Sequence, residues 1–462
     1  MRSHAPADGL KRAPLGVRSY VVSTALLLSV TACKGAQHPH VPAVGSETID
    51  LGRGGFSLRG ATGDGTHTYV ALGPATSTEA PTSTIEARTG THVDWTSKVT
   101  GDAGVLVAAG DLVAVAVAGR GEHIGSSEPY PKPLDKELVV RGDPGAVLTT
   151  LDRATGAVRF RVPVDGNEWS LITSIATLGD DVIIAGSFAG SLRVANSVVT
   201  SAGGSDGFVA RIRSDGQVMW LERMGGAGAD AIQGVATNGR DRIAIAGTFT
   251  AGADLLGEPL KPYDERLPYA DAFVAELDGN GARRWAQTFG GKGDESIAGV
   301  AIDARGDVVA AGSAREIVYV GGVQLDTQGE GDGVVIRYHD NGELGPAILL
   351  GGFDFDGLRA IAAVDDRIVV GGFFSGQMKL GARTLTAGGG DDAFIAELDP
   401  SGTVVTSWQI TGEGREEIVS LSATRGGFIA GVAHTATAKI DDETLPSPAD
   451  PVTGAALVIR GL

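Results

Sequence analysis

The stretch Gly290–Ala314, GGKGDESIAGVAIDARGDVVAAGSA, decides the fold. It has a glycine-rich opening with Lys292, a small apolar run SIAGVAI and a second run DVVAAGSA. One interpretation is a nucleotide-binding unit with a Gly/Lys loop around phosphates, and the other is two β-strands joined by a turn. The motif Gly-x-x-x-x-Gly-Lys-Ser/Thr is absent, and a β-like run bounded by Asp and Gly follows where a phosphate-binding loop needs a helix. The stretch therefore predicts two strands.

The same pattern recurs along the chain. Units beginning at Asp206, Asp271, Asp332 and Asp392 share it, and two weaker earlier copies contain IEARTGTHVDW and LTTLDRATGAVRF. The turn glycines of the first hairpin recur at nearly constant spacing, at Gly90, Gly156, Gly216, Gly281, Gly342 and Gly402. Lys292 becomes Ala227 and Phe353 in neighbouring copies, so the lysine is not what recurs. A regular period of this kind with four strand-like runs is typical of a β-propeller.

Seven runs are suited to the crowded innermost strand of a blade: FSLRGAT, VLVAAG, LITSIAT, AIQGVAT, SIAGVAI, LRAIAAV and IVSLSAT. The sequence thus predicts an all-β fold, a seven-bladed propeller of four-stranded blades over residues 47–462. The last blade has three runs before the chain stops, and Glu47–Gly52 is expected to supply its missing strand and close the ring. Tryptophans in the fourth strand are expected to pack between blades: Trp95, Trp220, Trp285 and Trp408.

The chain carries a net charge of −18. The segment Met1–Cys33 holds four basic side chains and only one acidic one, so the remainder carries −21. Such a surface repels the phosphates of nucleic acids and anionic lipid headgroups. We therefore expect no nucleic-acid partner, and contact with a membrane only through an anchor.

The amino terminus has the features of an export signal. Basic residues precede the apolar run Tyr20–Val30, which is too short to span a bilayer. Val30, Thr31 and Ala32 before Cys33 resemble a bacterial lipobox, which implies lipidation of Cys33 and a mature chain starting there. The alternative is an ordinary signal peptide with a coincidental cysteine. Residues 34–46 are interpreted as a tether, and Lys34 favours the outer membrane of a bacterial envelope.

The repeats resemble the SBBP-type β-propeller repeats of exported bacterial proteins. The resemblance rests on the unit DAFVAELDGNG…W…FGGKGDESIAGVAIDARGDVVAAGS and covers nearly all of residues 46–462. The copy LDRATGAVRF also resembles a quinoprotein-type repeat, with its Thr-Gly turn before an aromatic residue. Both resemblances imply the architecture and almost nothing about activity.

An acidic position recurs in four linkers between blades, at Asp230, Asp294, Asp356 and Glu416, and these residues should lie on one face. One interpretation is contact with Ca²⁺ or another cationic ligand, since hard cations take several oxygen ligands. The other is that the acids form turns by accepting backbone N–H bonds. No EF-hand spacing is present, and no other cofactor or metal is indicated by the motifs.

Catalytic motifs are missing from the sequence. The histidines His67, His92, His123, His339 and His434 form no His-x-x-His pair, and no Gly-x-Ser-x-Gly elbow occurs. Long loops after the second strand of some units carry Tyr130, Tyr263 and Tyr269 beside prolines. These tyrosines are either exposed anchors for a partner or side chains packed on their own loops.

Three functional hypotheses remain. The first is a monomeric, lipid-anchored, non-enzymatic propeller that binds a protein or a glycan. The second is an envelope enzyme, a lyase, hydrolase or quinone-dependent oxidoreductase, acting at the central channel, where Arg59 and Arg359 are the polar exceptions among small apolar residues. The third is a scaffold for outer-membrane assembly.

Overall fold

The computed structural model describes residues 47–51, 56–74, 82–118, 145–424, 426–434, 437–445 and 454–461. The chain divides into two units, Met1–Ala43 and Val44–Leu462, and every described residue belongs to the second. The predicted signal segment, its lipobox and Cys33 lie outside these residues. Secondary structure in the described part is entirely strand, turn and bend, and no helix there could cross a membrane. The predicted all-β class is confirmed.

In the first half of the chain, strands that follow one another in the sequence pair antiparallel and fall into sets of four. Their bounds are β2 (Phe56–Gly63), β3 (Thr68–Pro74), β4 (Thr82–Thr89) and β5 (His92–Thr100); β6 (Asp102–Ala109), β7 (Leu112–Ala118), β8 (Gly145–Asp152) and β9 (Val158–Gly166); β10 (Trp169–Leu178), β11 (Asp181–Val194), β12 (Ser197–Ile212) and β13 (Val218–Gly225).

The second half continues the pattern. Its strands are β14 (Ala231–Thr237), β15 (Arg242–Phe249), β18 (Asp271–Asp278) and β19 (Arg283–Gly291); β20 (Ser296–Ile302), β21 (Val308–Ala314), β24 (Asp332–Tyr338) and β25 (Leu344–Leu350); β26 (Gly357–Val364), β27 (Arg367–Phe374), β30 (Asp392–Leu398) and β31 (Val404–Gly412); β32 (Glu416–Thr424), β33 (Gly427–His434) and β36 (Gly454–Gly461). The segment expected to close the ring, β1 (Glu47–Asp50), pairs antiparallel with β36.

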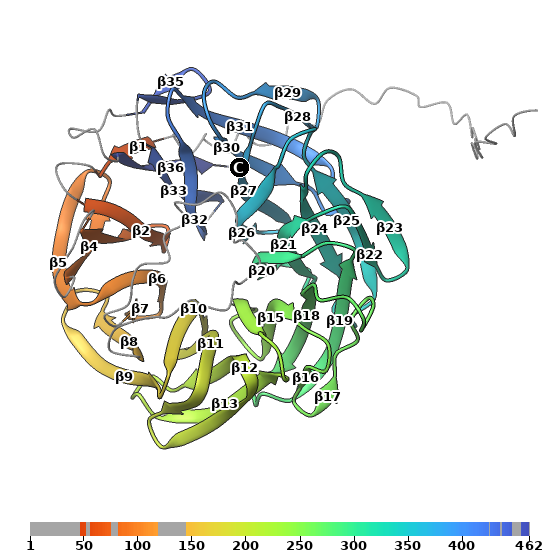
Figure 1. Cartoon of the computed structure of the whole chain (residues 1–462). Helices are drawn as coiled ribbons and strands as arrows, with labels where there is room; N and C mark the ends of the chain where they lie inside the picture. Colours follow the sequence, from red (N-terminus) through yellow and green to blue (C-terminus); the bar gives the residue numbers. More distant parts are fainter. Residues whose placement is uncertain are drawn as a thin grey trace, which may run out of the picture. The chain divides into compact units, whose positions relative to one another are not determined.

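The first strands of these sets surround a common centre (Figure 1). Each contacts the first strand of the next set, and β2 contacts both β6 and β32. Ala61 N–H donates to Ser420 Oγ at 3.1 Å, and the hydroxyls of Thr62 and Ser422 are 2.9 Å apart. The two ends of the repeat array are therefore joined at the centre, and the fold is a β-propeller, as the repeats predict.

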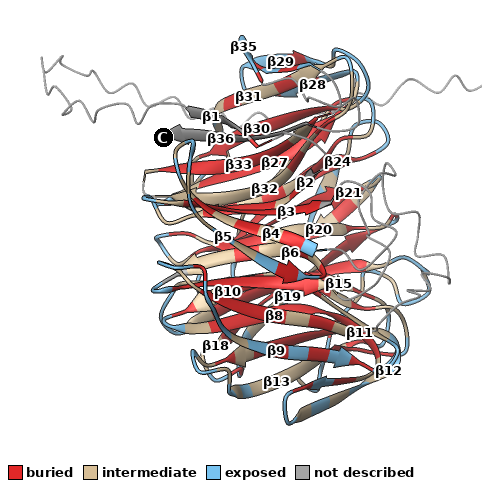
Figure 2. Ribbon diagram, turned by 90° about the vertical axis from the view of Figure 1, so that its left-hand side faces the viewer, coloured by how far each residue is buried: buried red, intermediate tan, exposed pale blue. Residues whose placement is uncertain are grey.

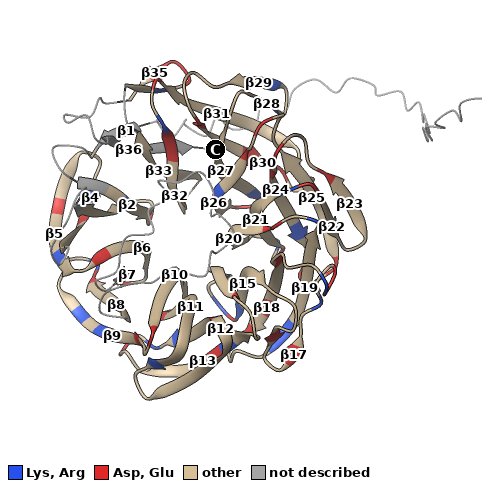
Figure 3. Cartoon of the chain, viewed as in Figure 1, with Lys and Arg blue, Asp and Glu red and all other residues tan. Residues whose placement is uncertain are grey.

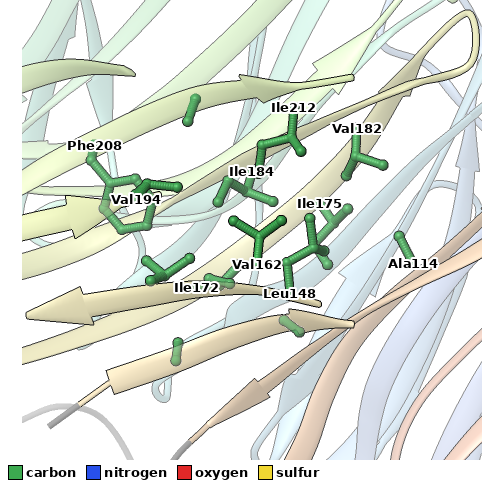
Figure 4. Close-up of a cluster of buried hydrophobic side chains, with 14 of the residues drawn as sticks. Ala114, Leu148, Val162, Ile172, Ile175, Val182, Ile184, Val194, Phe208 and Ile212 are labelled. Carbon is green, nitrogen blue, oxygen red and sulfur yellow. The ribbon is translucent and has the colours of Figure 1, made fainter. Parts of the chain in front are cut away.

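The core lies between successive sheets (Figure 2), where strands buried on both faces need continuous apolar runs. Figure 4 shows one such cluster, in which Leu148 and Val162 pack with Ile175, Ile184 and Phe208. These side chains come from β8, β9, β10, β11 and β12. Each sheet thus lacks a complete core of its own and is stabilised by its neighbours.

Turn glycines and fourth-strand aromatics fit together between repeats. All six turn glycines named above have positive φ, between 55° and 87°. A Cβ at Gly342 would lie 2.8 Å from Trp285 Cγ, and one at Gly281 would lie 3.1 Å from Trp220 Cδ2. Trp95 Nε1 donates to Arg153 O at 2.9 Å, and Trp408 packs edge-on to Phe428 at 5.4 Å. The predicted packing of these tryptophans between blades is confirmed.

Short hairpins cover several outer strands. They are β16 (Asp254–Leu255) with β17 (Glu258–Pro259), β22 (Ile317–Val320) with β23 (Val323–Asp326), β28 (Gln377–Leu380) with β29 (Arg383–Thr386), and β34 (Ala438–Ile440) with β35 (Glu443–Thr444). Strand β16 pairs with β13, β22 with β19 and β34 with β31, while the end of β11 pairs with β9. The hairpins occupy backbone groups that would otherwise form free sheet edges.

Candidate functional site

The acidic linkers lie on the face where a fourth strand crosses to the next inner strand. Asp230 Oδ2 accepts from Gly226 N–H at 2.6 Å, and its Oδ1 accepts from Thr250 N–H at 2.6 Å. Asp356 does the same with Gly352 N–H at 2.5 Å and Ser375 N–H at 3.1 Å. These two acids therefore hold the linker and the end of the second strand together, as the turn-forming interpretation requires.

In the linker after β19, the residue equivalent to Asp230 and Asp356 is Glu295. The sequence pattern assigns this position to Asp294, the preceding residue, and that assignment is wrong. The backbone N–H of Glu295 donates to Ala270 O at 3.2 Å, as Asp230 donates to Ser205 O and Asp356 to Gly331 O. Glu295 is buried, whereas Asp294 is half-buried and accepts from Ala270 N–H at 3.2 Å. Two consecutive acids made the register ambiguous in the sequence.

Each linker acid is paired with an acid on the third strand of the preceding blade. We call these sets the carboxyl pairs: Asp206/Asp230, Asp271/Glu295, Asp332/Asp356 and Asp392/Glu416. All eight side chains are buried. A Cβ at Gly225 would lie 2.6 Å from Asp206 Oδ1. A Cβ at Gly290 or Gly351 would likewise lie too close to the carboxylate of Asp271 or Asp332. The recurring glycines thus make room for a carboxylate, and the third-strand acids are site residues that the sequence reasoning missed.

Burial is the main cause of the raised pKa values in the carboxyl pairs. In the linker acids, the charge of the neighbouring carboxylate raises the pKa further. Together, burial and this charge raise the pKa of Glu295 to about 9 and that of Asp356 and of Glu416 to about 7. Burial raises the pKa of Asp271 and of Asp332 to about 6. Near neutral pH these linkers therefore hold protons that exposed carboxylates would have lost.

The tyrosines predicted as anchors differ in their surroundings. Tyr263 is 42% exposed and stacks on Tyr319 of β22, with ring centroids 4.9 Å apart and an interplanar angle of 8°. Its backbone N–H donates to Asp271, which fixes the loop beside a carboxyl pair. Tyr269 is 41% exposed. Tyr130 lies outside the described residues. Among the other aromatic side chains, Phe353 is 80% exposed, at the linker position that Lys292 occupies in the preceding copy.

The inner strands carry few charged residues, as Figure 3 shows. Arg59 Nε lies 3.1 Å from Asp102 Oδ1, and the guanidinium of Arg359 lies 4.8 Å from the centroid of the Phe373 ring. Both arginines thus have interactions with neighbouring side chains.

The histidines do not converge on one site. His67 and His92 form weak ion-pair contacts with Asp64 and Asp94, at 3.7 Å and 3.8 Å, and His339 lies 3.2 Å from Asp307. His434 is buried in β33, and His123 is outside the part that the structure describes. Within that part, no group of three or more His, Cys, Asp or Glu side chains is placed to hold a metal ion.

Two polar hollows lie on the side of the β14–β15 and β18–β19 turns, with volumes of about 500 Å³ and 470 Å³. Arg240 and Arg242 line both of them. Arg242 forms an ion pair with Glu276, and Arg211 forms one with Asp181 at 2.7 Å. Because the positive charges are largely neutralised by partners, the hollows do not form a strongly cationic site.

No protein-family model and no curated protein matches the chain, so the resemblance to SBBP-type repeats stays a prediction. Among solved structures, BamB from Moraxella catarrhalis is 12% identical and has a TM-score of 0.40, with 90% of this chain and 98% of that one covered. A europium-containing methanol dehydrogenase is 12% identical, with 91% and 93% covered and a TM-score of 0.42.

The β-propeller domain of the Trilobed protease from Pyrococcus furiosus is 11% identical, covers 86% of this chain and 98% of that domain, and has a TM-score of 0.46. At these values the similarities carry no argument about function.

Proposed function

We propose that the chain is an exported, lipid-anchored, monomeric propeller without enzymatic activity, and that its linker face binds a protein or a glycan of the cell envelope. We further propose that it has seven blades of four strands. The strand pairings support this number, because seven successive sets of four can be traced, with β1 as the fourth strand of the last set.

The observation that carries the binding proposal is the presence of two exposed tyrosines on one well-anchored loop of the linker face, between β17 and β18. The loop of Tyr263 is fixed through Asp271, Thr288 Oγ1 donates to Lys261 O at 2.8 Å, and Leu260 of the same loop is buried. Rigid aromatic side chains contribute contact area at low entropic cost, which suits a binding surface. Tyr269 extends this surface toward the linker, since Ala270 N–H donates to Asp294.

Site-specific photocrosslinking in the native envelope tests the binding proposal. A benzophenone amino acid replaces Tyr263 or Tyr269 in the full chain, and a third variant carries it at Met219, an exposed side chain on β13. We expect a discrete adduct from the two loop positions and none from position 219. Protease or glycosidase treatment of the adduct then assigns the partner to one class. No adduct, or the same adduct from all three positions, would contradict the proposal.

Lipid anchoring is tested separately. The variant Cys33→Ser should leave the membrane fraction on cell fractionation and incorporate no labelled fatty acid, while the folded propeller persists. Membrane retention of this variant would rule out the anchor and leave the binding proposal to its own test.

A further inference from the structure

The carboxyl pairs differ in their counter-charge. In the Asp206/Asp230 pair, Arg223 Nη1 donates to Asp206 Oδ2 at 2.6 Å. Arg223 lies opposite Phe208 in the β12–β13 ladder. The corresponding ladder positions in the next three blades hold Thr288, Leu349 and Gln409. Only the first of the four pairs therefore has an arginine built into the neighbouring strand.

The Asp332/Asp356 pair is the simplest of the uncompensated pairs. Asp356 joins the linker to β27 through Gly352 N–H and Ser375 N–H, while Asp332 Oδ2 accepts from Gln328 N–H at 2.8 Å. Asp356 N–H donates to Gly331 O at 2.9 Å, which places the two acids side by side. Both side chains are at most 2% exposed. The pair thus connects three segments of the linker face.

The segments packed beside this pair carry both acidic and basic side chains. Asp354 and Glu330 add negative charge, and Ser375 Oγ donates to Asp391 Oδ1 at 2.5 Å. Arg315 lies over the ring of Phe355 at 5.1 Å, and Lys379 is exposed on β28. In the described part of the chain, neither carboxylate forms an ion pair with a basic side chain. Asp354 is the further charged group that raises the pKa of Asp356, while the other four charged side chains, Glu330, Asp391, Arg315 and Lys379, belong to the segments packed beside the pair.

Two buried carboxylates side by side with no cation repel each other, and protonation of one removes the repulsion. The proton comes from solvent and returns to it when the pair ionises. Because burial holds the pKa of both acids well above the ordinary 3.8, at about 6 and about 7, the folded pair binds more protons than the unfolded chain. Its contribution to stability is therefore complete below about pH 4 and is lost as pH rises to about 7.

We propose that Asp332 and Asp356 form a pH-sensitive clasp, in which at least one carboxyl is protonated while the linker is closed and ionisation of both releases the linker from the start of β24. Residues Gly351–Asp356 then open locally without unfolding of the propeller. The clasp tightens the linker face under acidic conditions and loosens it under alkaline ones.

Hydrogen exchange of the full chain, measured at about pH 5 and about pH 8.5 and corrected for intrinsic exchange, tests the clasp. We expect opening at the Gly352 and Ser375 amides to increase on the order of tenfold or more at the higher pH. The amides of Gly226 and Thr250, beside the arginine-compensated pair, serve as the internal control and should change clearly less. Equal changes at the two linkers would overturn the proposal.

Two variants and one addition separate the clasp from other causes. Asp332→Asn removes one of the charges and should flatten the pH dependence at Gly352, whereas an unchanged dependence would refute the clasp. Arg223→Met should transfer a pH dependence to the 226–230 linker, and it keeps the test valid if Asp332→Asn does not fold. Added Ca²⁺ should not restore protection at about pH 8.5. If it does, the pair is a cation site and the clasp is refuted.

Discussion

The substitution Gly342→Ala tests the contact between a turn glycine and the tryptophan of the preceding blade. Gly342 has a φ of +82°, and a Cβ there would lie 2.8 Å from Cγ and 2.9 Å from Cδ2 of Trp285. Placing alanine in the left-handed region costs about 1–2 kcal/mol. Displacing a packed indole adds an overpacking cost of about 1–3 kcal/mol. We therefore expect the free energy of unfolding to fall by about 2–5 kcal/mol.

Gly322→Ala is the matched control. Gly322 has nearly the same φ, +84°, in the β22–β23 hairpin, but a Cβ there meets no atom within 4 Å. It should incur only the backbone cost of about 1–2 kcal/mol. The difference between the two variants isolates the contact with Trp285.

Urea unfolding followed by tryptophan fluorescence and by far-UV circular dichroism provides the measurement. Coincident transitions in the two signals justify the use of one free energy for the propeller. Equal losses from Gly342→Ala and Gly322→Ala would refute the argument that turn glycines seat the preceding blade's tryptophan. A second check is Trp285→Leu, which should reduce the penalty of Gly342→Ala when the two are combined.

Two further substitutions test the core and a buried ion pair by the same urea assay. Phe394→Ala should lower the free energy of unfolding by about 3–5 kcal/mol, because the ring is fully buried, whereas Phe353→Ala, at an 80% exposed position, should change it by less than about 0.5 kcal/mol. Arg337→Met should lower the free energy of unfolding by about 3–5 kcal/mol, because it leaves the buried Asp303 carboxylate without this guanidinium. Arg305 pairs with the same acid but is 44% exposed, so Arg305→Met should lower the free energy of unfolding by less than about 1 kcal/mol. Similar losses within either pair of variants would contradict the burial argument.

The strands were predictable because their pattern is local. The runs SIAGVAI and DVVAAGSA, taken as two strands, correspond to β20 and β21, and the turn glycines have the positive φ that the turns need. Each of these features depends on a few neighbouring positions. Repetition then indicated the propeller architecture, because the same arrangement of turn, strand and glycine recurs at nearly constant intervals, as from Gly281 to Gly342 and on to Gly402.

The linker acids show where local patterns stopped being sufficient. Asp294 and Glu295 are adjacent in the sequence, and only the hydrogen bond from Glu295 N–H to Ala270 O decides which of them occupies the buried position. Its partner Asp271 begins β18, and the whole of β19 separates that strand from the linker. Nothing in the linker itself indicates that it faces a second carboxylate.

By itself, the sequence determined the strand content and the repeated β architecture, because alternation, turn glycines and apolar runs act over short stretches of chain. It also determined that the corresponding fourth-strand positions of the four repeats hold different residue types, namely Arg223, Thr288, Leu349 and Gln409. Only the tertiary structure decided that acids from separate strands meet in buried pairs, and that Arg223 compensates one pair alone. The reason is physical: burial and the proximity of like charges are properties of the packed chain, and they fix the protonation of these groups only after the sheets have come together.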